Sequence, residues 1–162
     1  MSAADKDDRK ANKRGAARFA AVQALYQMDI AGTGLNDILN EFEKHRLGNE
    51  VDGSQYLPAE AAFFRDIVTG TVREQRKLDP LIDTALNEGW PLKRIEALLR
   101  AVLRAGAYEL DQKPEIPVRV VISEYVDVAN AFVDRDETGM VNAVLDMLAR
   151  KLRGGELNPV AS

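Results

Sequence analysis

Segment 95–110, which contains the sequence LLRAVLRAGAYEL, constrains the fold more than any other part of the chain. At about 100° per residue, its large apolar side chains cover one broad arc of a helix. The opposite side is not a polar stripe, because it carries Ala97, Ala101, Ala105 and Ala107. Small side chains permit the close approach of other helices. The segment is therefore predicted to be a central helix that neighbours contact on several sides.

Two arginines interrupt this helix. Arg100 follows Glu96 by four residues, a spacing typical of a modest surface ion pair. Arg104 has no acid three or four residues away, so a covered Arg104 needs a carboxylate from another helix. We expect Arg104 to be mostly covered and paired with Glu124 first and Asp146 second, and Arg100 to be the more exposed of the two. The alternative is that Arg104 lays its stem on the alanines and reaches water.

Apolar residues recur at helical spacing in most of the remaining chain, and no segment alternates apolar and polar residues as a strand does. The pattern predicts an all-α protein of about seven helices, at 18–30, 35–45, 58–77, 78–89, 95–110, 118–132 and 140–152. Pro58 suits the first turn of its helix, and Asp79 with Pro80 predicts the start of a separate one. Gly70 lies in the middle of a helix, where a close helix crossing would explain it.

The termini differ from this pattern. Residues 1–12 are polar and are predicted to be a disordered arm, and residues 154–162 a loose tail. Residues 1–18 hold six basic and three acidic residues, a local charge of +3, whereas the whole chain carries −4. On a helix Arg14 and Arg18 share a face, which Lys10 joins if the helix starts early. Basic side chains on a helix face suit a phosphate backbone, although an ordinary solvated terminus has the same composition.

Enzyme classes find little support in the sequence. It has no phosphate-binding GxxxxGK[ST] loop, no GxGxxG motif after a strand and no GxSxG turn. There is no cysteine, and His45, the single histidine, lies at a polar helix end where capping is the expected role. No metal site, cofactor or catalytic residue is predicted. No window resembles a membrane span, and the lack of cysteine fits a cytoplasmic protein.

Five blocks of the sequence resemble the NusB family of transcription antitermination factors. They are RFAAVQALYQMD, FFRDIVTGTVREQRKLD, AVLRAGAYEL, IPVRVVISEYVDVANAF and MVNAVLDMLARKL, in the order and spacing of that family over roughly residues 14–152. The resemblance implies one helical domain over 13–153, built of two packed three-helix-type halves at about 13–88 and 89–153. It implies no catalysis.

The resemblance also implies partners. Members bind boxA-type RNA together with NusE, a small-subunit ribosomal protein, and join the elongating RNA polymerase complex with other Nus factors on ribosomal RNA operons. They exist as monomers or homodimers. Two other functions are compatible with the sequence. The chain could be a protein-interaction scaffold without direct RNA binding, or a detached subdomain of an enzyme.

The resemblance also implies which residues of this chain contact RNA. Basic residues before and within the first helix correspond to Lys13, Arg14 and Arg18, beside Lys10. Tyr26 ends the QALY block, near the surface that the family uses for partner and RNA. Met140 and Asn142 lie in the MVN block, where some members have an RNA-proximal aromatic residue in place of Met140. The basic run is interrupted by GAA, which predicts weaker RNA binding without NusE.

Overall fold

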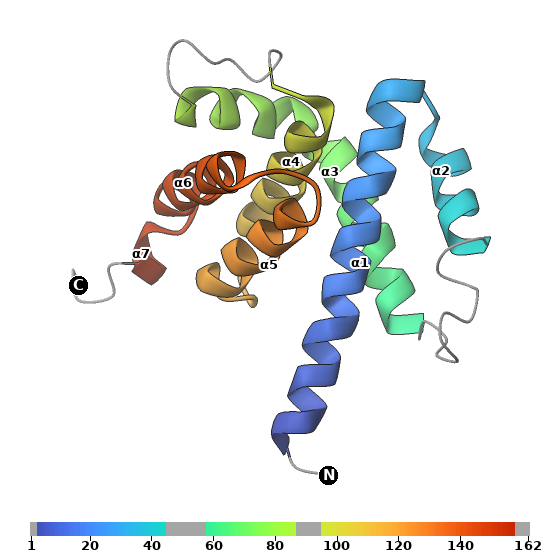
Figure 1. Cartoon of the computed structure of the whole chain (residues 1–162), viewed down its shortest axis with the longest axis horizontal. Helices are drawn as coiled ribbons and strands as arrows, with labels where there is room; N and C mark the ends of the chain where they lie inside the picture. Colours follow the sequence, from blue (N-terminus) through green and yellow to red (C-terminus); the bar gives the residue numbers. More distant parts are fainter. Residues whose placement is uncertain (1–2, 45–57, 87–94, 158–162) are drawn as a thin grey trace.

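The structure is a computed structural model that describes the backbone of residues 3–44, 58–86 and 95–157, and side chains within 14–44, 60–86 and 95–155. All elements in these ranges are helices (Figure 1), which confirms the all-α class. They are α1 (Ala3–Ala31), α2 (Leu35–Phe42), α3 (Pro58–Ala85), α4 (Ala97–Gln112), α5 (Val118–Asn130), α6 (Arg135–Leu152) and α7 (Gly154–Leu157). His45, predicted as a cap residue, lies outside the described residues.

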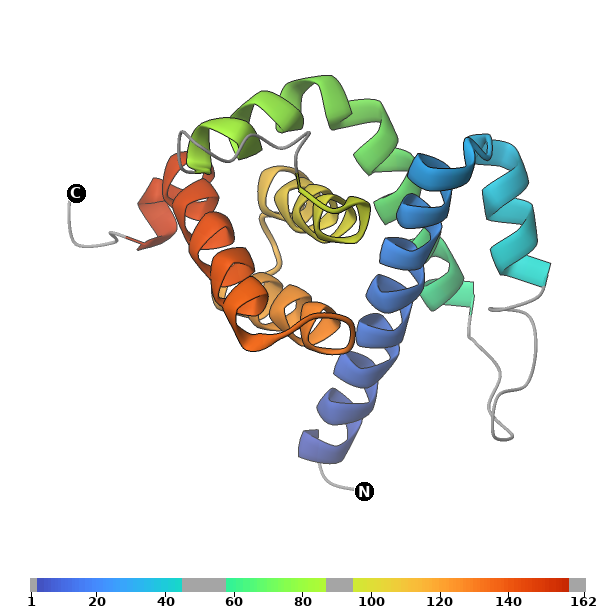
Figure 2. The ribbon, with the colours of Figure 1, turned by 45° about the horizontal axis from the view of Figure 1, so that its top comes forward.

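Helix α4 is the centre of the molecule, as predicted. It packs against α1, α3, α5 and α6, and Figure 2 shows it enclosed by these helices. Its small residues make this possible, because Ala101, Ala105 and Ala107 are all buried and offer no bulk to keep neighbours away. The helix thus joins the N-terminal helices α1–α3 to the C-terminal helices α5 and α6.

The predicted close crossing at Gly70 is confirmed. A Cβ atom built on Gly70 would lie 2.1 Å from Cζ of Tyr108, so α3 meets α4 where only glycine fits. The Tyr108 hydroxyl donates a hydrogen bond of 2.8 Å to Asp66 on α3. The pKa of Tyr108 is raised to about 12, mainly because the side chain is buried and secondly because of this hydrogen bond. Tyr108 therefore stays neutral and fixes the depth at which the two helices cross.

The prediction of a separate helix starting at Asp79 and Pro80 is wrong. Pro80 lies inside α3, which continues to Ala85 and bends along its course (Figure 2). Proline removes one main-chain hydrogen bond and bends a helix without always ending it. Leu78 and Ile82, on either side of Pro80, are fully buried, so tertiary packing holds both parts of the helix in place.

Continuity of α3 explains why the predicted partners of Arg104 are also wrong. Arg104 is mostly covered, with 14% of its side chain exposed, but its Nε and Nη2 atoms bind the two carboxylate oxygens of Asp79, both at 2.8 Å. Asp79 does not start a helix, so its carboxylate is free to face α4. Asp146 instead pairs with Arg150 of its own helix at 3.0 Å, and Glu124 lies beside a different arginine.

Arg100 forms an ion pair of 2.8 Å with Asp29 near the end of α1. Its side chain is 23% exposed against 14% for Arg104, which confirms that Arg100 is the more exposed of the two. Both arginines of α4 therefore bind carboxylates from the N-terminal helices.

The C-terminal end of α4 is capped from α6. Arg153, which is buried, donates hydrogen bonds to the main-chain carbonyls of Glu109, Leu110, Lys113 and Ile116. Glu109 and Leu110 lie in the last turn of α4, where carbonyls lack partners within the helix, and Lys113 and Ile116 lie in the turn that follows. One guanidinium therefore joins the end of α4 to this turn.

Both termini contain more helix than predicted. Helix α1 begins at Ala3, so residues 3–12 of the predicted disordered arm are helical, although the side chains of residues 1–13 lie outside those described. Alanine, lysine and arginine favour helix, and extending an anchored helix needs no new nucleus. In the predicted loose tail, Gly154–Leu157 form the single turn α7, and residues 158–162 are outside the described part.

Gly70→Ala should destabilise the protein by about 1–3 kcal/mol, because the added methyl group overpacks the contact with Tyr108. Urea unfolding followed by circular dichroism measures this. Gly139→Ala is the matched control, since Gly139 lies in α6 with open space around its Cα. That change should stabilise by about 0.5–1 kcal/mol. Equal effects of the two substitutions would contradict the close crossing.

Candidate nucleic-acid interface

The N-terminal part of α1 extends away from the rest of the molecule (Figure 1), whereas its C-terminal part is packed into the core. The change occurs near residue 17, since Ala17 and Ala21 are fully buried. Lys10 and Lys13 lie in the extending part, with side chains outside those described. The basic run is therefore carried on a helix end that stands clear of the body, and Arg14 is its first described side chain.

Arg14 is half-buried and lies over an aromatic ring. Its guanidinium carbon is 5.0 Å from the ring centroid of Phe63 on α3, a distance typical of a cation–π interaction. No ion pair or hydrogen bond of the Arg14 guanidinium is found among the described residues. Its charge and its hydrogen-bond donors thus remain available for an anionic ligand.

Arg18, predicted to contact RNA from an exposed arm, is instead buried. Only 2% of its side chain is exposed, and that of its partner Glu109 on α4 is fully buried. The Arg18 Nε and Nη2 atoms donate to the two Glu109 carboxylate oxygens at 2.8 and 2.9 Å. One more turn of helix brings the side chain from the free end into the core. Arg18 therefore ties α1 to α4 and is not accessible to RNA in this structure.

Two further groups complete this buried cluster. The Tyr125 hydroxyl on α5 donates to Glu109, and Glu124 lies 3.7 Å from Nη1 of Arg18. Burial lowers the pKa of Arg18, but the hydrogen bond and charge of Glu109 outweigh it, so that the pKa is raised. The pKa of Tyr125 is raised well above its usual value, chiefly because the side chain is buried and next because the Glu109 charge lies beside it. Arg18 thus stays charged and Tyr125 neutral, as the cluster requires.

Glu124 is the less buried of the two carboxylates. Burial raises its pKa although the charge of Arg18 lowers it. The prediction that Glu124 belongs to an interhelical tie identified the right kind of interaction with the wrong arginine.

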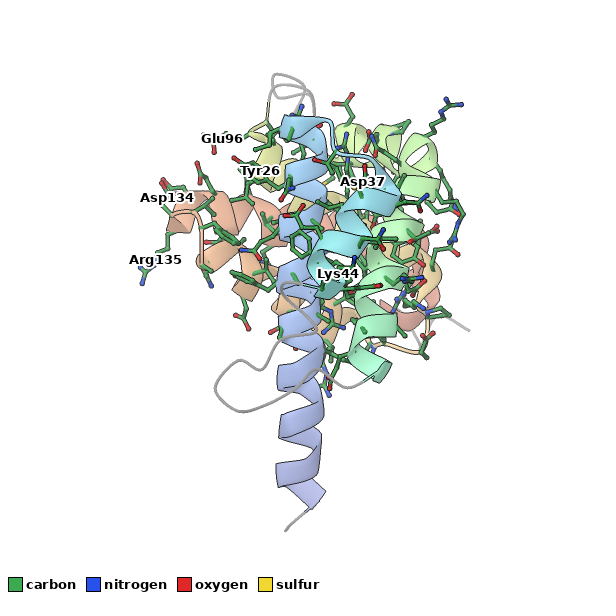
Figure 3. The ribbon with its side chains drawn as sticks, turned by 90° about the vertical axis from the view of Figure 1, so that its right-hand side faces the viewer. Tyr26, Asp37, Lys44, Glu96, Asp134 and Arg135 are labelled. Atoms are coloured by element: carbon green, nitrogen blue, oxygen red, sulfur yellow. The ribbon has the colours of Figure 1, made fainter. Side chains whose placement is uncertain are left out.

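The other predicted RNA-binding residues lie on two helices. Tyr26 is half-buried on α1, on the side toward Glu96, Asp134 and Arg135 (Figure 3). On α6, Met140 is half-buried against the core and Asn142 is exposed. Among the described residues, no hydrogen bond, ion pair or ring contact joins Tyr26, Met140 or Asn142 to Arg14, so the structure does not bring the predicted site residues into one compact cluster.

Sequence reasoning missed Glu109 and Phe63. Glu109 could have been found, because it follows Gly106 by three residues on the apolar arc of α4, where a carboxylate needs a partner. Arg18 carries the matching signal, since Ala21, Val22 and Leu25 continue its face of α1. Phe63 has no such signal, because its apolar neighbourhood in FFRDIV is typical of any core helix.

These features define a class of protein, namely an all-helical protein whose first helix carries a run of basic residues towards its free end. Within the described residues there is no group of three or more histidine, cysteine or acidic side chains that could hold a metal ion. None of the described helices is both long and apolar enough to cross a membrane.

Comparison with known proteins gives the family. The NusB family model matches residues 15–150. A "Transcription antitermination protein NusB" from Bradyrhizobium sp. (strain ORS 278) is 74% identical over 152 residues, covering 94% of this chain and 90% of the relative. The protein of the same name from Bradyrhizobium diazoefficiens is 75% identical over 149 residues, covering 92% and 90%. The chain belongs to the NusB family, a family of transcription antitermination factors and not of enzymes, as the sequence predicted.

Solved structures agree with this assignment. The structure described as T. maritima NusB has a TM-score of 0.75 and 27% identity, covering 90% of this chain and 96% of that one. A chain from the crystal structure of antitermination factors NusB and NusE in complex with dsRNA has a TM-score of 0.72 and 25% identity, covering 86% and 98%. The fold is therefore that of the family.

Arg18→Ala should destabilise the protein by about 3–5 kcal/mol, because it leaves the Glu109 charge buried without a partner. Arg65→Ala is the control: Arg65 also binds a carboxylate, that of Glu43 at 2.6 Å, but its side chain is 56% exposed. Its loss should cost less than about 1 kcal/mol. Urea unfolding measures both, and an Arg18→Ala variant as stable as Arg65→Ala would show that the tie contributes little.

Proposed function

We propose that this protein binds boxA-type RNA together with NusE and supports processive transcription of ribosomal RNA operons in the cytoplasm, as part of the elongating RNA polymerase complex with other Nus factors. The observation that carries RNA binding is Arg14, a charged side chain held at the surface with its donors free, on the helix end that also contains Lys10 and Lys13. Family membership and the NusB–NusE–dsRNA structure support the choice of ligand and partner.

Lys10, Lys13 and Arg14 are proposed to contact phosphates, because cationic side chains on a helix end suit a phosphate backbone. Arg18 is left out of this set, since its donors are used by Glu109. Asn142 and Met140 on α6 and Tyr26 on α1 are proposed to line the remainder of the surface. An exposed amide can hydrogen-bond to bases, whereas a half-buried methionine offers only apolar contact in place of aromatic stacking.

A scaffold that binds proteins without RNA is the second candidate. It is favoured by the net charge of −4 of the whole chain, which opposes general nucleic-acid binding. The two differ in salt dependence, because RNA binding releases counterions and weakens steeply as salt increases.

Arg14→Glu should weaken binding of a boxA-type RNA oligonucleotide about ten-fold and make its salt dependence less steep, because one phosphate contact is lost. Fluorescence anisotropy over a range of salt concentrations measures both effects. Arg150→Glu is the control, since Arg150 is 70% exposed near the C-terminal end of α6. Its RNA affinity should change little. Equal affinities of the Arg14→Glu variant and the unaltered protein would remove Arg14 from the RNA surface.

NusE should raise the affinity for boxA-type RNA by about 100-fold or more, because two proteins that touch one RNA and each other gain by effective concentration. RNA titration at fixed salt, with and without saturating NusE, tests this expectation. The Arg14→Glu variant should still bind NusE in the absence of RNA, which separates the two contacts. Identical dissociation constants for RNA with and without NusE would exclude cooperativity.

A further inference from the structure

Phe63 contacts two arginines that differ in their burial and in their binding partners. The guanidinium carbons of Arg14 and Arg18 both lie 5.0 Å from the centroid of its ring. Arg18 is buried and bound by Glu109. Arg14 is half-buried, and among the described residues its guanidinium has this cation–π contact and no ion pair or hydrogen bond. The same aromatic ring thus contacts both Arg18, which ties α1 to α4, and Arg14, which is proposed to bind RNA.

A ring restrains an arginine differently from a carboxylate. The face of an aromatic ring attracts the cation without accepting its in-plane N–H donors, so that charge and donors stay available. A carboxylate uses donors and cancels the charge. Arg65, on the same helix as Phe63, shows this second case, because its Nε and Nη2 atoms both donate to Glu43.

We infer that Phe63 is a positioning residue for RNA binding, which holds the Arg14 guanidinium in place for a phosphate while leaving its donors free. This inference rests on the proposed function. The ring is itself held on a packed helix, since its neighbour Phe64 is fully buried and Phe63 packs against the core. A side chain restrained in advance loses less conformational freedom when it binds. The RNA then contacts Arg14 directly and Phe63 acts through it.

A double-mutant cycle in RNA binding tests the inference. The variants are Phe63→Leu, Arg14→Ala and the double variant, each titrated with fluorescein-labelled boxA-type RNA at fixed salt. Phe63→Leu keeps apolar volume and removes the ring, and it should weaken binding about two- to five-fold, the factor that a partly exposed cation–π contact supplies. In the Arg14→Ala background the same change should have no effect. Phe63→Tyr keeps the ring and should retain the affinity of the unaltered protein.

The outcomes separate this inference from the proposed function. If Arg14→Ala weakens RNA binding and Phe63→Leu does not, Arg14 binds RNA without help from the ring and only the positioning role is overturned. If Phe63→Leu weakens binding equally with and without Arg14, the ring acts by a route other than Arg14, and the inference is again overturned. If Arg14→Ala has no effect, both the RNA assignment of Arg14 and the role of Phe63 fail. Thermal unfolding of each variant checks that it is folded.

Discussion

The ion pair between Arg18 and Glu109 is the interaction on which the arrangement of the molecule depends. It joins α1 to the central helix α4, and Tyr125 extends it to α5. Burying two charges is costly unless the pair is well aligned and its remaining groups are bonded. Here the two-point contact and the tyrosine hydroxyl meet these conditions. The pair therefore fixes how α1 is placed against α4 and α5.

Small residues make that arrangement possible. Gly70 lets α3 approach Tyr108, and a Cβ atom on Gly106 would lie 2.9 Å from Leu145 of α6. With α4 approached this closely from both sides, polar groups near the crossings have reduced access to water and find partners within the protein. Arg104 with Asp79, and Arg18 with Glu109, are two instances of the same requirement.

The helical fold and the central position of α4 could be predicted from the sequence because both depend on local periodicity and side-chain size. The pairing of charges could not, because it depends on which helices meet. The spacing rule shows that Arg104 needs a carboxylate from another helix, but it does not show which one, and Asp79 faces Arg104 only because α3 continues through Pro80. For the site, the basic run predicts RNA contacts at the N-terminal end of the chain, and this stays a prediction, whereas the burial of Arg18 follows from where α1 enters the core. The contact of Arg14 with Phe63 is tertiary and leaves no trace in either segment.

The continuity of α1 from Ala3 to Ala31 has a consequence for how this surface can evolve. Arg18 fixes the rotation of the helix about its own axis, because its side chain must point at Glu109. Arg14, one turn earlier, then has a fixed angular direction, which changes by about 100° for each residue added or removed between the two. A substitution near Arg14 alters one side chain at a time, whereas a single insertion or deletion between Arg14 and Arg18 would turn Arg14 away from Phe63. The length of that short stretch is thus under stronger constraint than its composition.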